Sequence, residues 1–411
     1  MLYGKSCRRK KGSILILMLL MAGMITSCKD SRAEENKEAL IIKNIPEQEL
    51  TVEDNSSDAG NVTEDFQVSE EKEAADPEEN GMKEKFGENC IADQTFEVEL
   101  SEYNGQVYFV PFAPSEDGQA FSMQIIQNGE VLTQINPYIP DGISENGFTS
   151  LDAAAFYDVN YDGNTDIVLI ETYGSTSFAA VYYGFGKDAE DYARRFMPER
   201  KLSRAISNGV TTLTIPEIRN FLSDGKKNGQ FAGYGEAYRA VSRLCQLESE
   251  GAMEYNLIYV DEDDIPELAA GVSGYYVSLY TYHEGTVYTL MDQWGYGAMG
   301  NVGYEYSPRQ NSLRNYNTDY AGAILYTTYM TIGSSYSIDI EASLVTYNFD
   351  DVNENGMPDE DEMGSLGLYG ITYMDGVEIK YDESIPCDVG GYEYIDTAMS
   401  RENLNSELEG K

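Results

Sequence analysis

The chain has 411 residues and is strongly acidic, with 71 Asp and Glu against 28 Lys and Arg and a formal net charge of −43. Such a surface repels phosphate backbones and anionic lipid headgroups, which argues against nucleic-acid binding and makes cations the natural partners. The single histidine, His283, excludes zinc sites built from several histidines. The five cysteines show no CxxC spacing, which argues against a zinc ribbon or a thioredoxin-type motif.

The first 27 residues have the layout of a signal peptide. Five basic residues lie within the first eleven, and the apolar run 14–25 that follows is short for a membrane span. The run ends in Ile25-Thr26-Ser27-Cys28, which resembles the lipobox of bacterial lipoproteins. That resemblance implies cleavage before Cys28 and lipidation of its sulfur, so we expect a protein that is anchored to the membrane and faces outward.

Residues 28–90 are predicted to be a lipid anchor followed by an acidic, disordered tether. Between Lys29 and Cys90 there are 19 acidic and 7 basic residues, and the only aromatic residues are Phe66 and Phe86. Little apolar surface is therefore available to offset the entropy lost on ordering, and like charges extend the chain.

Residues 91–200 are predicted to form a β-rich module. Apolar and polar residues alternate in segments 106–110 and 122–126, and the pair Asn128-Gly129 that follows is typical of a tight hairpin turn.

Within this module, residues 158–166 (loop 1) carry oxygen-bearing side chains at positions 1, 3, 5 and 9 and a glycine at position 6. Calcium takes six to eight oxygen ligands, and a glycine at position 6 permits the sharp turn around the ion. The predicted ligands are Asp158, Asn160, Asp162 and Asp166, with a backbone carbonyl from Asn164. The loop leads straight into an apolar strand and resembles the calcium loops of FG-GAP or VCBS repeats in integrin-α-like propellers. An acidic turn without metal is the alternative interpretation.

Residues 201–252 are predicted to contain a pair of helices. Thr214 and Glu217 have the spacing of a capping box at the start of the first helix. A second apolar stripe with helical spacing runs from Tyr234 to Glu248.

Residues 253–411 are predicted to form a second β-rich region with two further loops. Residues 259–267 (loop 2) align with loop 1 but have Tyr259 at position 1 and Asp264 in place of the glycine. Loop 2 is therefore either a weak metal site or a vestigial turn, and its candidate ligands are Asp261, Asp263 and Glu267. Its end, Ile265-Pro266-Glu267-Leu268, resembles a segment of uncharacterised surface lipoproteins of gut Firmicutes.

Residues 351–362 (loop 3) satisfy the whole pattern D-x-[DN]-x-[DN]-G-x5-E and form the strongest motif in the chain. The predicted ligands are Asp351, Asn353, Asn355, Asp359 and Glu362, with a backbone carbonyl from Met357. Loop 3 resembles an EF-hand or dockerin calcium loop, and an acidic turn without metal is again the alternative interpretation. However, residues 343–349 have the pattern of a strand and Met363-Gly364 would break a following helix, which argues against a calcium sensor with flanking helices.

The predicted fold is mostly β and α+β overall, with two or three β-rich modules around the helical pair. The loops begin 101 and 92 residues apart, too far for single propeller blades, so the sequence leaves propeller closure open. Gly295 to Gly300 matches GxGxxG, but no helical pattern follows, which argues against a dinucleotide site. Cys90 and Cys387 are left as either a disulfide or free thiols.

These features predict a cell-surface lipoprotein that binds Ca²⁺ through its loops. Its expected role is a binding or adhesion module with structural calcium, and its expected ligand is a glycan or a surface protein. The alternative is an exported polysaccharide hydrolase that uses two carboxylates, with supportive calcium. The sequence favours the module without enzymatic activity, because no apolar pocket marks a particular pair among the many carboxylates.

Overall fold

The computed structural model describes residues 77–411 except for seven gaps, at 116–117, 186–194, 224–230, 250–251, 299, 368–369 and 380–384. The predicted signal peptide, Cys28 and the tether up to residue 76 lie outside the described residues. No helix within the described ranges has the length and apolar character needed to cross a membrane.

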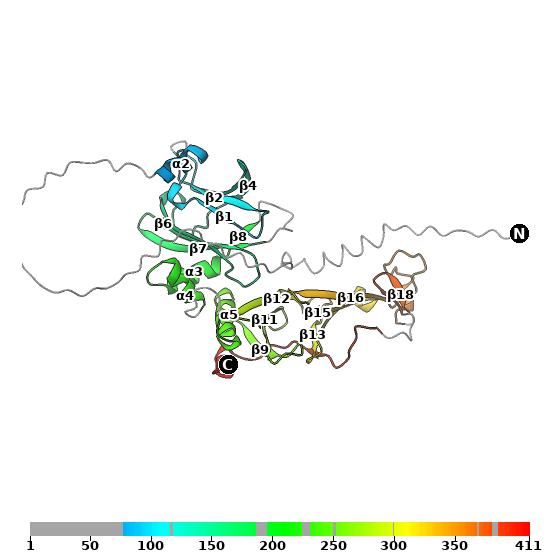
Figure 1. The fold of residues 1–411 in the computed structure, drawn as a ribbon. Helices are drawn as coiled ribbons and strands as arrows, with labels where there is room; N and C mark the ends of the chain where they lie inside the picture. Colours follow the sequence, from blue (N-terminus) through cyan, green and yellow to red (C-terminus); the bar gives the residue numbers. More distant parts are fainter. Residues whose placement is uncertain are drawn as a thin grey trace, which may run out of the picture.

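Four antiparallel sheets and a layer of helices make up the described fold (Figure 1). The first sheet contains β1 (Phe96–Glu99), β2 (Gln106–Phe112), β3 (Ser122–Gln127) and β4 (Glu130–Ile135), and the second contains β5 (Phe148–Tyr157), β6 (Asp166–Tyr173), β7 (Thr176–Gly184) and β8 (Phe196–Pro198). In both sheets the strands pair in chain order. The turn at Asn128-Gly129 has positive φ at both residues, as predicted for a two-residue hairpin.

The second sheet is buried on both faces, because alternate residues of its central strand pack in opposite directions. Ile167 and Leu169 of β6 face the first sheet, whereas Val168 and Ile170 face the helices. This double burial explains why β6 appears in the sequence as a continuous apolar run rather than an alternating pattern.

Three helices, α3 (Arg200–Gly209), α4 (Ile215–Leu222) and α5 (Tyr234–Glu248), cover the far face of the second sheet. The predicted pair corresponds to α4 and α5. The Thr214 hydroxyl caps α4 by accepting a hydrogen bond from the Glu217 amide at 3.3 Å. The first helix, α3, was not predicted, because only Leu202 and Ile206 mark its buried side among polar residues.

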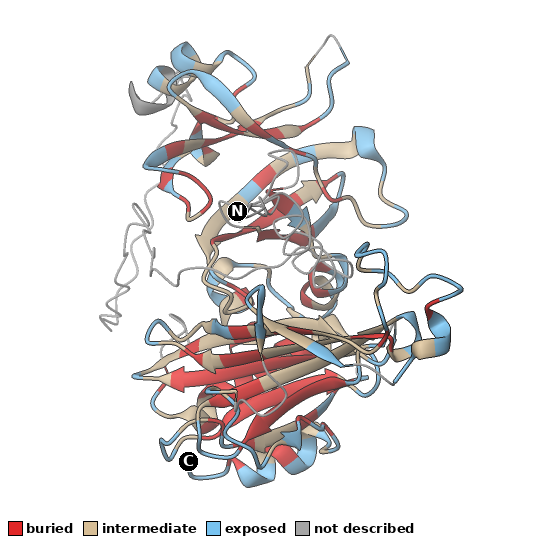
Figure 2. Ribbon diagram, turned by 90° about the vertical axis from the view of Figure 1, so that its right-hand side faces the viewer, coloured by how far each residue is buried: buried red, intermediate tan, exposed pale blue. Residues whose placement is uncertain are grey.

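The third sheet packs on the other side of α5. It contains β9 (Glu254–Ile258), β10 (Glu267–Val272), β11 (Tyr276–His283) and β12 (Thr286–Gly295). Its second face packs against a seven-stranded sheet whose order is β18-β17-β16-β15-β14-β13-β19. Figure 2 shows the buried central strands of this half of the molecule between exposed edges. The buried contacts therefore place the layers in the order first sheet, second sheet, helices, third sheet and seven-stranded sheet.

The seven-stranded sheet is formed by β13 (Gly303–Ser307), β14 (Ser312–Asp319), β15 (Ile324–Ile332), β16 (Ile338–Tyr347), β17 (Ile371–Met374), β18 (Val377–Ile379) and β19 (Glu393–Tyr394). Short 3-10 turns lie at Ala92–Gln94, Glu145–Gly147, Tyr320–Gly322 and Met363–Ser365. A last helix, α6 (Arg401–Glu407), packs beside α5, and Leu404 enters the core there.

The mostly β fold is thus confirmed, and within the described residues no sheet closes into a barrel or propeller. The predicted tether boundary at residue 90 needs correction. Residues Pro77–Phe86 form helix α2, and Cys90 is buried against Val110 and Ile126 of the first sheet. Met82 and Phe86 also pack there, so two apolar residues are enough to dock this otherwise acidic segment.

Candidate functional site

Loop 1 connects β5 to β6, and its first carboxylate organises the turn. The Asp158 carboxylate accepts hydrogen bonds from the amides of Asp162, at 3.2 Å, and Gly163, at 2.9 Å. Asp162 in turn accepts from the amide of Asn164 at 2.9 Å. Tyr161 and Gly163 have φ of 62° and 80°, so the chain turns sharply at positions 4 and 6. The glycine permits this backbone without a steric penalty.

Asp166 closes loop 1 at the start of β6. This residue is fully buried, and its carboxylate accepts hydrogen bonds from the amides of Val159, at 2.7 Å, and Gly184, at 2.8 Å. The predicted ligand at position 9 therefore joins the two ends of the loop and links them to the end of β7.

Loop 3 connects β16 to β17 and repeats the hydrogen-bond network of loop 1. Asp351 accepts from the amides of Asn355, at 3.1 Å, and Gly356, at 2.9 Å. The Asn355 side chain then accepts from the Met357 amide at 2.8 Å. Positions 4 and 6 again have positive φ, 58° at Glu354 and 76° at Gly356. Two separate sequences with the predicted pattern thus adopt one loop conformation.

Glu362 closes loop 3 as Asp166 closes loop 1. Its carboxylate accepts from the amide of Val352 at 2.8 Å and from the amide of Asp359 at 3.0 Å. A strand precedes the loop and a single 3-10 turn follows it, so loop 3 lacks the flanking helices of an EF-hand, as the sequence predicted.

Loop 2 connects β9 to β10 and keeps only the second half of this network. The Glu267 carboxylate closes it, accepting from the Val260 amide at 2.8 Å and from the Thr281 hydroxyl at 3.2 Å. Asp261 and Asp263 each accept a backbone amide two residues further on. Position 1 is the exposed Tyr259, whose ring lies 4.4 Å from the Arg309 guanidinium carbon, so this loop has no first carboxylate.

The oxygen atoms of loop 1 include one acceptor without a partner and two crowded carboxylates. The Oδ1 atom of Asn160, at position 3, is buried and has no hydrogen-bond partner. Although Asp158 as a whole is exposed, its carboxylate turns into the loop, where loss of water and then the nearby Asp162 raise its pKa to about 7. An unpartnered acceptor beside crowded carboxylates is the kind of environment that a hard cation satisfies.

The described residues do not, however, contain a group of three or more Asp, Glu, His or Cys side chains arranged to hold a metal ion. The reason is visible in the loops, where most carboxylate oxygens accept backbone amides or side-chain amides such as that of Asn160, which donates to Asp162 at 3.0 Å. A cation in this geometry would need amide and backbone oxygens as ligands together with the carboxylates.

Loop 1 also contacts the second half of the molecule. The Tyr161 carbonyl accepts hydrogen bonds from the Thr289 amide at 3.1 Å and from the Thr289 hydroxyl at 2.6 Å, both from β12. The Tyr161 ring packs at the helical layer and lies 6.3 Å from the ring of Phe231. The conformation of loop 1 is therefore coupled to the packing of the third sheet.

Sequence reasoning did not predict that Glu102, Glu171 and Glu267 are buried, although it named Glu267 as a candidate ligand of loop 2. Each is at most 1% exposed, and burial raises the pKa of each to about 8. Their segments contain no local signal for this, because many exposed glutamates of the chain stand at similar positions in strands and turns. Only the packing of two sheets against each other removes water from them.

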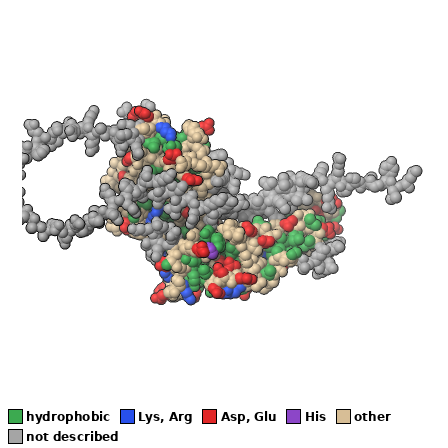
Figure 3. All heavy atoms as spheres, in the orientation of Figure 1, with side chains coloured by type: hydrophobic (Ala, Val, Ile, Leu, Met, Phe, Trp, Pro, Cys, Tyr) green, Lys and Arg blue, Asp and Glu red, His purple; other side chains and the backbone are tan. Residues whose placement is uncertain are grey.

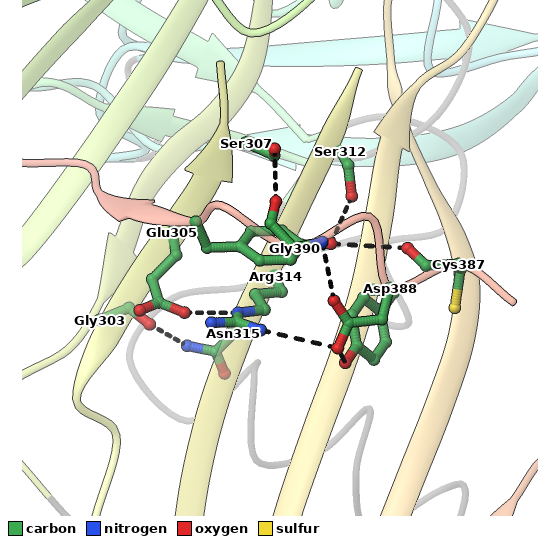
Figure 4. Close-up of polar contacts among 11 residues, drawn as sticks. Gly303, Glu305, Ser307, Ser312, Arg314, Asn315, Cys387, Asp388 and Gly390 are labelled. Atoms are coloured by element: carbon green, nitrogen blue, oxygen red, sulfur yellow. Dashed lines mark hydrogen bonds and ion pairs between the residues drawn. The ribbon is translucent and has the colours of Figure 1, made fainter. Parts of the chain in front are cut away.

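A second polar cluster fixes the C-terminal segment onto the seven-stranded sheet (Figure 4). Arg314 donates to Glu305 at 2.6 Å, lies 3.9 Å from Asp388, and stacks its guanidinium group 3.8 Å from the Tyr392 ring. Ser307 donates to the Gly390 carbonyl at 2.7 Å. Because Glu305 is paired with an arginine, this cluster serves to hold the segment in place and does not offer a free acid.

The remaining candidates from the sequence behave as surface or structural residues. His283 ends β11 with a half-exposed side chain and stacks on Tyr336, which also stacks on Tyr288, with both ring separations 4.6 Å. Trp294 is half-buried and contacts Tyr304. No dinucleotide-binding helix follows Gly300, because β13 begins at Gly303.

The redox alternatives are also resolved. Cys90, Cys245 and Cys387 are free, and Cys90 and Cys387 lie in separate buried clusters.

On the face of the molecule that Figure 3 shows, acidic side chains are spread over the described residues, whereas Lys and Arg side chains are sparse.

Comparisons with models of known protein families and with curated protein sequences find no match to this chain.

Proposed function

We propose that the protein is a cell-surface lipoprotein that binds calcium through loops 1 and 3, and that bound calcium stabilises a β-rich binding or adhesion module. The observation that carries the proposal is the shared network of the two loops. In both, the first carboxylate accepts the amides of positions 5 and 6, and position 5 accepts the amide of position 7. One conformation reached from two sequences points to a shared ligand.

The proposed ligands in loop 1 are the side chains of Asp158, Asn160 and Asp162 and the carbonyl of Asn164, with Asp166 closing the loop. In loop 3 the corresponding groups are Asp351, Asn353, Asn355, Asp359 and the carbonyl of Met357, with Glu362 as the closing carboxylate. Oxygen-only sites of this kind suit calcium, and extracellular modules work with dissociation constants of about 10⁻⁴ to 10⁻³ M. Loop 2, which lacks the first carboxylate, is assigned a structural role.

The predicted signal peptide and the lipobox-like segment support a location outside the membrane, where calcium is abundant and where the predicted acidic tether would space the fold from the lipid. Its ligand is proposed to be a glycan or another surface protein. The stacked rings of His283, Tyr336 and Tyr288 support this assignment, since partly exposed aromatic groups are enriched at binding surfaces.

Thermal unfolding of the purified full-length protein tests this proposal, after chelation and then with 2 mM calcium. With a dissociation constant of about 10⁻⁴ M, each occupied loop adds about 1.8 kcal/mol to the free energy of unfolding. Asp162→Ala and Asn355→Ala should each remove part of the calcium-induced rise in melting temperature. Glu262→Ala, which changes an exposed residue of loop 2, is the control and should leave the calcium-induced rise in melting temperature unchanged. A fully folded chelated protein whose melting temperature ignores calcium would refute the proposal.

A further inference from the structure

We infer that the turns at one end of the packed third and seven-stranded sheets form a docking surface for an arginine-bearing segment of a partner protein. This surface (the ring end) consists of His283, Glu284, Tyr288, Tyr336 and loop 2. The inference rests on the binding role proposed above and names the class of partner.

The direction of the strands brings these turns together. Loop 2, the hairpin turn between β11 and β12 and the turn between β15 and β16 lie at the same end of the two sheets. Asn311, in the turn between β13 and β14, joins them, because its amide donates to the Val260 carbonyl at 2.8 Å and its side chain donates to the Ile332 carbonyl at 2.9 Å. Turns held on a rigid pair of sheets in this way are frequent places for binding.

An aromatic stack connects the two sheets at the ring end. The Tyr336 ring, from the seven-stranded sheet, lies 4.6 Å from the rings of both His283 and Tyr288, from the third sheet, and the planes differ by 28° and 30°. All three side chains are partly exposed. In Figure 3 the single histidine, in purple, lies among hydrophobic and acidic side chains on the surface. Aromatic faces attract cations, most often the guanidinium group of arginine.

Negative charge surrounds this stack. Loss of water raises the pKa of Tyr336, and four nearby acidic groups raise it further, namely Tyr288, Glu284, Asp263 and Asp261. The Glu284 side chain is 86% exposed. Within the described ranges, no Lys or Arg lies over the Tyr336 ring or forms an ion pair with Glu284. The ring end therefore attracts a positively charged partner and repels an anionic one.

The choice of arginine follows from a combination that this chain already uses. Arg309 lies 4.4 Å from the Tyr259 ring and 3.3 Å from the Asp264 carboxylate, and the Arg314 cluster in Figure 4 again combines a ring with a carboxylate. A planar guanidinium group can stack on a ring and pair with a carboxylate at once. A neutral glycan would use the rings but not the surrounding charge, so the observations favour a protein segment.

The test is fluorescence anisotropy of a labelled peptide of alternating glycine and arginine, titrated with the purified full-length protein. About 0.15 M sodium chloride screens general attraction to the acidic surface. Tyr336→Leu keeps an apolar side chain but removes the ring, and it should weaken binding by about threefold or more. Tyr275→Leu is the matched control with an expected change below about 1.5-fold, because Tyr275 is 73% exposed at the opposite end of the third sheet. Circular dichroism confirms that each variant is folded.

A second pair of variants tests the charge without disturbing the packing. Glu284→Gln should weaken binding of the arginine peptide by about twofold. Glu130→Gln, at the exposed turn between β3 and β4, removes the same charge elsewhere and should have no effect. A peptide with glutamate in place of each arginine should not bind, and the neutral sugar maltohexaose should not compete with the arginine peptide.

Two results would overturn the inference. Equal effects of Tyr336→Leu and Tyr275→Leu would show only general attraction to an acidic surface. Binding of maltohexaose that depends on Tyr336, without binding of the arginine peptide, would overturn the inference and leave the proposed binding module intact with a glycan as its ligand. If neither probe binds, the binding role of this surface fails together with the inference, whereas calcium binding is decided separately by thermal unfolding.

Discussion

Glu171 provides a quantitative test of how the two N-terminal sheets pack. It lies on β6 and is fully buried, and neither oxygen of its carboxylate forms a hydrogen bond of good geometry, although the Tyr173 hydroxyl is near enough to lower its pKa slightly. The titratable groups that face it are the tyrosines Tyr173 and Tyr182. Burial raises the pKa of Glu171 from 4.5 to about 8, so the folded protein holds this side chain protonated at neutral pH.

The sign of the effect follows from proton linkage. Below about pH 4.5 Glu171 is protonated in both the folded and the unfolded chain, so its ionisation does not change the free energy of unfolding. As the pH rises towards 8, the unfolded chain ionises freely while the folded chain does not, so the free energy of unfolding falls. Each tenfold change in proton affinity corresponds to about 1.4 kcal/mol, which gives a cost of about 3 kcal/mol at pH 7 and about 4 kcal/mol at pH 8.

We therefore predict that Glu171→Gln stabilises the protein by about 3 kcal/mol at pH 7 and by about 1 kcal/mol or less at pH 5. Urea unfolding of both proteins across this pH range measures the difference. Glu130→Gln, at the exposed turn between β3 and β4, is the control for removal of one negative charge. A difference between Glu171→Gln and the parent that stays constant with pH would refute the reasoning, because it would mean that Glu171 ionises in the folded state.

Three further predictions follow from other contacts. Gly184→Ala should lower the free energy of unfolding by about 2 kcal/mol, because the added methyl group would collide with Glu102 and Thr165. Gly147→Ala is the control, because its added methyl group would have no neighbouring atom closer than 3.9 Å. In the same urea experiment it should change the free energy of unfolding by less than half as much. Arg314→Ala leaves the buried Glu305 carboxylate without its arginine partner, whereas Asp388 keeps the hydrogen bond from the Tyr329 hydroxyl, and the change should cost about 3 kcal/mol. Limited proteolysis should then cut within residues 385–395, whereas unchanged cleavage would argue against the fixed segment. Alkylation followed by mass spectrometry should modify Cys387 before Cys90 and Cys245, which are only 3% and 4% exposed, and the reverse order would contradict their burial.

Local chemistry in the sequence predicted a large part of the fold. The hairpin at Asn128-Gly129 and the helix cap at Thr214 are determined by residues within a few positions of each other, and both are present. The loop pattern also translated directly into structure, since the carboxylate at position 1 accepts the amide of the glycine at position 6 in both loops 1 and 3.

What the sequence could not provide depends on contacts between distant segments. The burial of Glu102 beside loop 1 arises because Ser101 meets Thr165, which is 64 residues away. The stacking of two sheet pairs around α5 likewise follows from the two opposite faces of one helix, on which Leu244 and Tyr238 pack in different cores. Periodicity identified α5 as helical but did not indicate that both of its faces are covered.

The most direct test of the account is the number of calcium ions bound per chain, measured by equilibrium dialysis of the purified full-length protein at millimolar calcium. The account predicts two ions, one lost with Asp162→Ala and the other lost with Asn355→Ala, because loops 1 and 3 share one network and loop 2 lacks its first carboxylate. A chain that binds no calcium, or whose bound calcium is unaffected by both substitutions, would contradict it.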